Sequence, residues 1–375
     1  MQNAVEITNW LISDGVTQDS PADLLQKISL ILRSAGLPVD RSTLGAPILH
    51  PVAQSSYAFW DLESGSSQRW FIYTPELLES LKVSPIYPIY ARGEATSIRL
   101  DRPTERTAYP VGEDLWTDGY TQYEAMPLRF SDGTYKVITL ATKSQNGFSQ
   151  SDISLVQDIT PALALVFENL ISRNSAKTLM ETYVGKRAGL RVLDGEISRG
   201  DGSHIDAVIW FSDLRGFTSL AESRTESELI TILNDYFERL TNTIENHSGE
   251  VLKFIGDAVL AIFPHNNNIK DAVRRAEAAA LQVLDPDEGS RDYTFGVGLH
   301  SGSVFYGNVG GGNRLDFTVI GPSVNIASRI SGLCGTLDRQ LLASSEFVSS
   351  SARTWSSLGE QQLKGSNHAL EIFSI

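Results

Sequence analysis

Short apolar and aromatic runs, separated by polar and glycine-containing breaks, recur between residues 56 and 142. They are SYAFWDL, QRWFIYT, TSIRL, YEAMPLRF and YKVITLAT. Runs of this length that are rich in β-branched and aromatic residues predict β-strands. The break between the last two contains Asp132-Gly133, which favours a tight reversal. The N-terminal half is therefore predicted to be an α+β domain that contains a hairpin.

A helical period follows these runs. Apolar residues three and four positions apart predict one apolar helix face, and they are Val156, Ile159, Leu163, Val166 and Leu170. Such a face either pairs with a second copy of the helix or packs on its own domain, and the spacing does not choose between these interpretations. Pro161 is expected to kink or weaken the helix. Beyond it, RAGLRVLDGEISRGDGSH has the composition of a polar connector.

The C-terminal half begins with a different pattern. Residues 207–211 form a short apolar run typical of a buried strand. Residues 225–246 have a 3.6-residue apolar period, and Thr225 and Glu228 have the spacing of a capping box, so this segment predicts an amphipathic helix. The run VLKFIGDAVLAIFP, residues 251–264, predicts two buried strands that are joined by a tight turn.

Two charged residues interrupt that last run, and a buried charge needs a partner, a ligand or a metal. They are Lys253 and Asp257, and Asp257 lies at the expected hairpin tip. If the tip lies beside the end of the preceding strand, Asp257 converges with Asp213. Two adjacent carboxylates repel unless a divalent metal lies between them, and oxygen ligands suit Mg²⁺ or Mn²⁺. The alternative for Asp213 is that it caps the next helix.

A polar pair follows the strand that is predicted at residues 317–320. Asn325 and Arg329 are four residues apart on the helix predicted over residues 324–333, so they share one face. An amide beside a guanidinium can orient a sugar and neutralise charge on a phosphate. The alternative is an ordinary polar helix face.

Charge and composition exclude several classes of partner. The formal net charge is −14, which argues against unspecific binding to nucleic acid or anionic membranes, because both need a basic face. No run of 18 uncharged apolar residues occurs, so no membrane span is predicted. Cys334 is the one cysteine, which excludes an intrachain disulfide and fits a cytoplasmic location.

The stretch EAMPLRFSDGTYKVITLATKSQNGFSQSDISLVQDITPALALVFE resembles the end of a GAF domain. In that family a proline-containing strand, a hairpin, a second strand and a GFS-containing turn lead into the last helix. The resemblance implies a sensor or dimerisation role. It leaves open a small-molecule ligand of unknown identity.

Three motifs in order resemble those of the class III nucleotidyl cyclases. They are FSDLRGFT, LKFIGDAVLAIF and FTVIGPSVNIASR, and the closing LKGSNHALEIFSI extends the resemblance over about residues 205–375. The resemblance implies a ferredoxin-like α+β catalytic domain at residues 201–375. A helical linker at 171–200 would join it to the GAF-like sensor or dimerisation domain at 1–170.

The cyclase resemblance implies a site for two Mg²⁺ or Mn²⁺ ions. Their ligands would be Asp213, Asp257 and the backbone carbonyl of Leu214. The residues of the next turn would hold the leaving pyrophosphate, and they are Gly216, Phe217 and Thr218.

The resemblance also assigns the residues that contact the nucleotide. Asn325 would orient the ribose, Arg329 would stabilise the transition state, and Lys364 would contact the terminal phosphates. Lys253 and Thr318 would read the base. Lysine has only donors, which suits N1 of adenine, and the threonine hydroxyl can accept from the N6 amine, so ATP is favoured over GTP.

These implications together describe an adenylate cyclase that forms 3′,5′-cyclic AMP and pyrophosphate and is regulated by its N-terminal domain. Its sites would be shared in a head-to-tail homodimer. One chain would supply the two aspartates, and the other would supply the lysines, Thr318, Asn325 and Arg329. Two alternatives stay open: a nucleotide-binding regulatory homologue with little turnover, and a cyclase that acts on GTP or a pyrimidine nucleotide.

Overall fold

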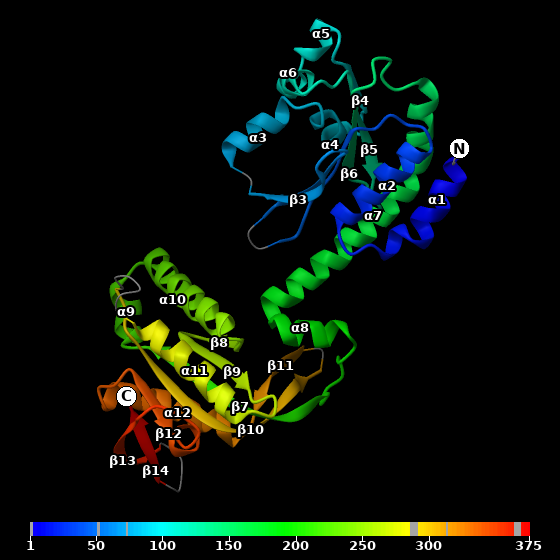
Figure 1. Ribbon diagram of the computed structural model, residues 1–375. Helices are drawn as coiled ribbons and strands as arrows, with labels where there is room; N and C mark the ends of the chain where they lie inside the picture. Colours follow the sequence, from blue (N-terminus) through cyan, green and yellow to red (C-terminus); the bar gives the residue numbers. More distant parts are fainter. Residues whose placement is uncertain (1–2, 51–52, 73, 286–291, 313, 364–368) are drawn as a thin grey trace. The chain divides into compact units, whose positions relative to one another are not determined.

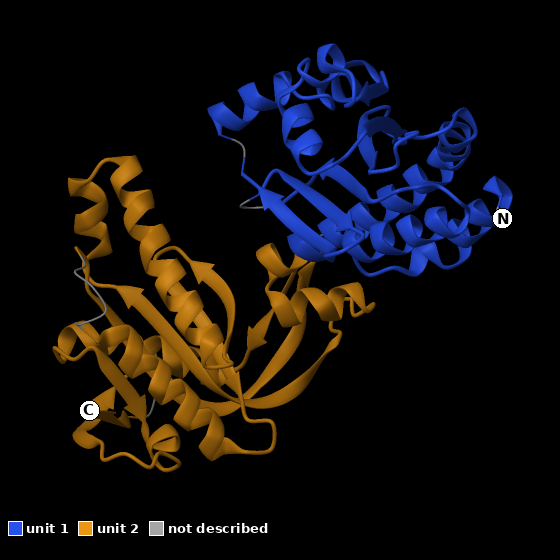
Figure 2. Cartoon of the chain, turned by 45° about the horizontal axis from the view of Figure 1, so that its top comes forward, with its two compact units in different colours: residues 1–179 blue, residues 180–375 orange. Residues whose placement is uncertain are grey.

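The computed structural model describes residues 3–50, 53–72, 74–285, 292–312, 314–363 and 369–375. The chain divides into two compact units, residues 1–179 (unit 1) and residues 180–375 (unit 2) (Figure 2). The division falls within the segment 171–200, which the sequence assigns to a linker.

An antiparallel sheet organises unit 1 (Figure 1). Over the described residues its strand order is β3-β2-β1-β6-β5-β4. The strands are β1 (Arg41–Pro47), β2 (Ser55–Asp61), β3 (Gly65–Phe71), β4 (Thr96–Arg99), β5 (Gln122–Arg129) and β6 (Tyr135–Thr142). All five predicted runs are strands, and the predicted hairpin joins β5 to β6 with Gly133 at φ +82°. The sequence does not predict β1, because RSTLGAP contains no apolar run.

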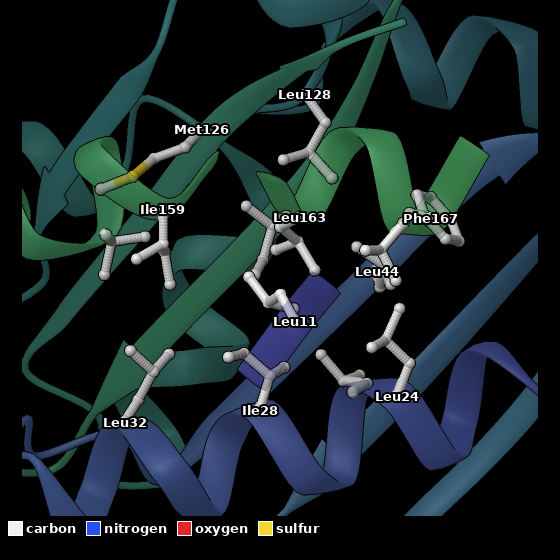
Figure 3. Packing of buried hydrophobic residues seen from close by; sticks show 14 of the residues in the cluster. Leu11, Leu24, Ile28, Leu32, Leu44, Met126, Leu128, Ile159, Leu163 and Phe167 are labelled. Atoms are coloured by element: carbon white, nitrogen blue, oxygen red, sulfur yellow. The ribbon is translucent and has the colours of Figure 1, made fainter. Parts of the chain in front are cut away.

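Helices cover both faces of this sheet. They are α1 (Ala4–Ser13), η1 (Gly15–Thr17), α2 (Pro21–Ser34), α3 (Pro75–Lys82), α4 (Tyr87–Arg92), α5 (Pro103–Arg106), α6 (Pro110–Thr117) and α7 (Gln150–Val184). One face packs with α1, α2 and α7 into the larger core of the unit, which includes Leu11, Ile28, Leu44 and Leu163 (Figure 3). The other face carries a smaller cluster with residues of α4 and α6.

The apolar face of α7 packs on its own unit. All five residues of the 3-4-3-4 spacing are at most 5% exposed and belong to the larger core. The second of the two interpretations of this pattern therefore holds, and self-pairing through this face is excluded. The helix continues through Pro161 to Val184.

Among the described residues, α7 is also the one helix that is long and apolar enough to cross a membrane. Core helices of water-exposed domains pass the same test of length and composition. Because α7 buries its apolar face in unit 1, its hydropathy is weak evidence for a membrane span.

A second sheet organises unit 2. Over the described residues its strand order is β13-β14-β12-β10-β7-β9-β8, and β11 pairs with β10. The strands are β7 (Gly202–Leu214), β8 (Glu250–Ile255), β9 (Ala258–Pro264), β10 (Phe295–Gly311), β11 (Arg314–Ile320), β12 (Leu341–Ser344), β13 (Ser356–Gln362) and β14 (Ala369–Ser374). The helices are α8 (Lys186–Leu193), α9 (Phe217–Ser223), α10 (Glu226–Asn246), α11 (Ile269–Leu284), α12 (Pro322–Thr336) and α13 (Ser345–Val348).

Alternation along β7 places the two faces of this sheet against different helices. Val208 and Trp210 pack with α10 and α11, whereas Ala207 and Ile209 pack with α8 and α12. The predicted amphipathic helix is α10, and its capping box is present. The segment predicted as a polar connector instead contains α8, whose Ala188 is fully buried. The small residues Ala188 and Gly189 allow this close packing. The polar composition of the segment as a whole does not predict it.

Candidate functional site

The two aspartates of the candidate metal site lie at the same end of the sheet. Asp213 is near the end of β7 and pairs with Ala258 of β9, and Asp257 directly precedes Ala258 in the β8–β9 turn. Burial raises the pKa of Asp213, and the nearby negative charge of Asp257 raises it further. A hydrogen bond from the Ser331 hydroxyl to Asp213 Oδ1 (3.1 Å) opposes this rise. The structure thus meets the condition that the sequence leaves open, because the hairpin tip lies beside the end of β7 and the two carboxylates converge.

The chemistry of this pair fits a divalent cation. Within the described residues no group of three or more His, Cys, Asp or Glu side chains could hold a metal. Mg²⁺ typically uses one or two carboxylates and fills its other positions with water and substrate phosphates, so two aspartates are enough. A cation would also relieve the repulsion that raises the pKa of Asp213. Leu214, the proposed carbonyl ligand, is the last residue of β7.

The turn after β7 is built around a glycine. Gly216 has φ +65°, a left-handed conformation that favours glycine, and it directly precedes Phe217 and Thr218 in the first turn of α9. No side chain among the described residues caps α9. The alternative in which Asp213 caps this helix is therefore wrong, because its Oδ1 instead accepts from Ser331. The side chain of Arg215 fixes the turn by donating to the backbone carbonyl oxygen of Cys334, at 3.0 Å.

Asn325 and Arg329 lie together on α12, as their spacing predicts. They line an open groove of about 560 Å³ with residues of the β11–α12 turn, including Gly321 and Pro322. Asn325 is exposed and Arg329 is half-buried. Thr318, two residues before the end of β11, is 8% exposed.

The face of α12 that carries these residues is turned away from the aspartates. Ser331, which contacts Asp213, follows Arg329 by two positions, so the two side chains lie about 200° apart around the helix. The described lining of the groove includes neither Asp213 nor Asp257. One chain therefore presents the aspartates and Arg329 in two different directions.

Lys253 has an ion-pair partner that the sequence analysis does not predict. Its Nζ lies 2.7 Å from Oδ2 of Asp316 on β11, and this contact lowers the pKa of Asp316. Asp316 and Thr318 are two positions apart on β11, so they share a face of the strand. Lys253 therefore pairs with Asp316, whereas Asp257 lies near Asp213.

The strand β8 is more exposed than the sequence predicts. The sequence treats residues 251–264 as buried, but β8 ends the strand order and Phe254 and Ile255 are each 47% exposed. The apolar pattern does not distinguish an interior strand from one at the edge. Lys364, expected to contact the terminal phosphates, lies outside the described residues.

Comparison with known proteins bears on the family of the C-terminal part of the chain. Residues 202–374 match the model of the family described as Adenylate and Guanylate cyclase catalytic domain. This part of the chain is a cyclase catalytic domain. The family covers cyclases for both purine nucleotides, so the match alone leaves the nucleotide open.

Relatives that match this chain include named adenylate cyclases. The adenylate cyclase of Anabaena cylindrica is 37% identical over 147 residues, which are 36% of this chain and 29% of the relative. Adenylate cyclase 1 of Rhizobium meliloti is 26% identical over 417 residues, 97% of this chain and 61% of the relative. The crystal structure of the adenylyl cyclase CyaB from P. aeruginosa matches at 24% identity with a TM-score of 0.41, over 46% of this chain and 93% of that one. The chain spans less than two thirds of both curated relatives.

Proposed function

We propose that the chain is an adenylate cyclase that converts ATP to 3′,5′-cyclic AMP and pyrophosphate. The choice of ATP rests on Lys253. Its ammonium has three donors, of which one binds Asp316, so a donor remains for N1 of adenine. The Thr318 hydroxyl can accept from the N6 amine. Guanine presents the opposite pattern, a donor at N1 and an acceptor at O6, which this pair would match poorly.

The remaining residues would bind and orient the reacting groups. When bound by Asp213, Asp257 and the Leu214 carbonyl, two Mg²⁺ or Mn²⁺ ions would supply Lewis acidity toward the ribose 3′-hydroxyl and the phosphates. Asn325 would hold the ribose so that its 3′-oxygen attacks the α-phosphorus in line. Arg329 would neutralise the negative charge that develops on the α-phosphate as the bond to pyrophosphate breaks. The proton of the ribose 3′-hydroxyl would be released to solvent. Removal of one such contact typically costs about 3–4 kcal/mol of transition-state stabilisation.

We propose further that each site is shared between two chains of a head-to-tail homodimer. The observation that supports this is the opposite orientation of Ser331 and Arg329 on α12. Because Ser331 faces Asp213 of the same chain, Arg329 faces away from it and is free to serve the aspartates of a second chain. A homodimer would then have two sites, and an isolated chain would have none.

Unit 1 is proposed to be a GAF-like regulatory domain, in a protein of the cytoplasm. The burial of the 156–170 face excludes regulation through self-pairing of that face. Contacts of α8 support another route. The Arg191 guanidinium lies 5.1 Å from the ring centre of Phe317, which stands between Asp316 and Thr318 on β11. Since α8 follows α7 directly, a change in α7 would reach the base-reading strand through this contact.

The direct test is an assay of the purified chain with Mn²⁺ and either ATP, GTP or CTP, in which cyclic nucleotides are quantified by mass spectrometry. Cyclic AMP is expected as the main product, and Asp257→Asn, which keeps the shape of the side chain, should abolish it. Binding of ATP without turnover would favour the regulatory homologue. A larger yield of another cyclic nucleotide would contradict the assignment of Lys253 and Thr318.

A further inference from the structure

Unit 1 contains a cavity on the face of its sheet opposite the larger core. Its volume is about 270 Å³, just below the ~300–1,000 Å³ usual for small-molecule sites. Strands β1, β2, β5 and β6 form its floor, and α3 and α6 contribute to its walls. The residues that line it all belong to unit 1, whereas the described residues of the candidate cyclase site belong to unit 2.

The walls of this cavity are mostly apolar. Helix α3 has a strongly amphipathic sequence, PELLESLK, yet none of its residues is buried. Its Leu77, Leu78 and Leu81 line the cavity instead of a packed core, and Leu78 remains 43% exposed. An apolar helix face that borders empty space gains little from the hydrophobic effect. A bound apolar group would supply the missing contacts.

Among the described residues that line the cavity, Arg41 of β1 is the one cation. Among the described residues no carboxylate lies within 4 Å of its guanidinium. Its cross-strand neighbour on β2 is Asp61, but Asp61 instead accepts a hydrogen bond from the Tyr120 hydroxyl (2.8 Å) and another from the Glu63 backbone amide. The five guanidinium donors of Arg41 are thus available to an anionic group.

Neighbouring contacts hold the shape of the site. Tyr57 packs flat against Gly45, where an added Cβ would lie 2.1 Å from its ring. The Tyr57 hydroxyl lies 2.7 Å from that of Tyr90 on α4. Beside Arg41, the hydroxyl oxygens of Thr43 and Thr139 lie 2.6 Å apart. The floor is therefore preformed, which lowers the ordering cost of binding.

We propose that this cavity binds a small organic acid, a molecule with an apolar body and one carboxylate. The body would lie against the leucines of α3, and the carboxylate would accept from the Arg41 guanidinium. Complementary polarity at each end would fix the orientation of the ligand. This site is independent of the proposed cyclase reaction, and its test needs no nucleotide.

The test measures binding to the full chain by isothermal titration calorimetry with octanoate and 4-phenylbutyrate, and with 1-octanol as a neutral probe of the same chain length as octanoate. Saturable binding of at least one acid is expected. Arg41→Met should weaken that acid roughly 10-fold or more, because a charge-assisted hydrogen bond is lost, and should leave 1-octanol binding unchanged. Arg129→Met, which removes an exposed arginine from β5 of the same sheet, is the matched control and should have no effect.

A second variant tests the position of the site without removing a charge. Ala141 of β6 faces the cavity and is 2% exposed, so Ala141→Leu should fill space and block both the acids and 1-octanol while the protein stays folded. Three results would overturn the proposal: no saturable binding of either acid to the wild type, equal binding by the Arg41→Met variant, or undiminished binding by a folded Ala141→Leu variant.

Discussion

Asp316→Asn tests whether base selection depends on the ion pair with Lys253. The paired side chains are 50% and 33% exposed, so solvent screens their attraction and the pair contributes about 0.2–1 kcal/mol to folding. The melting temperature should therefore fall by at most about 4 °C. Catalysis should suffer more, because a freed lysine adopts many rotamers and rarely points at the base. We expect kcat/KM for ATP to fall roughly 10-fold, or about 1.4 kcal/mol.

The assay is steady-state formation of cyclic AMP over a range of ATP concentrations, with a melting curve for each variant. Asp271→Asn is the matched control, because it weakens ion pairs with Arg274 and Arg275 on α11 at similar exposure (39%). Its kcat/KM should equal that of the wild type. An unchanged kcat/KM for Asp316→Asn, or an equal loss in both variants, would refute the positioning role of Asp316.

Two further predictions concern unit 2. Gly298→Ala places a Cβ 2.4 Å from the backbone nitrogen of Ser331, so α12 has to shift. The free energy of unfolding in urea should therefore fall by about 1–3 kcal/mol. An unchanged midpoint of urea unfolding would contradict this packing. Burial raises the pKa of Glu250 above its ordinary 4.5 despite a hydrogen bond from Tyr306. The folded protein then loses stability as pH rises through that elevated pKa. Glu250→Gln should therefore melt at a higher temperature than the wild type at pH 8, with no advantage near pH 4; the opposite trend would contradict the shift.

Local patterns in the sequence predict the position of each of Asp213 and Asp257, whereas their convergence depends on which strands pair. One aspartate ends an apolar run and the other lies at a hairpin tip, and the pairing of β7 with β9 joins them. The partners Ser331 and Asp316 are not predicted. They lie 118 and 63 residues from the side chains that they contact, and neither belongs to a periodic pattern.

Helix α7 shows a different limit of pattern reasoning. The 3-4-3-4 spacing correctly identifies a face that is buried, but amphipathicity does not specify what buries it. Here the sheet of unit 1 and helices α1 and α2 cover that face. The sequence does not predict β1, because this strand has only two large apolar side chains, Leu44 and Pro47. It lies in the middle of the sheet, so tertiary pairing rather than composition determines its structure.

Mixing two inactive variants tests whether each active site is shared between two chains. Asp213→Ala and Arg329→Ala are purified separately, shown to be inactive with Mn²⁺ and ATP, and then mixed under conditions in which subunit exchange is confirmed. Half of the dimers would be mixed, and one of the two sites in each would be intact, so roughly one quarter of the wild-type activity should return. No recovery of cyclic AMP formation would mean that each chain holds its own site, and the proposed sharing of sites would be wrong.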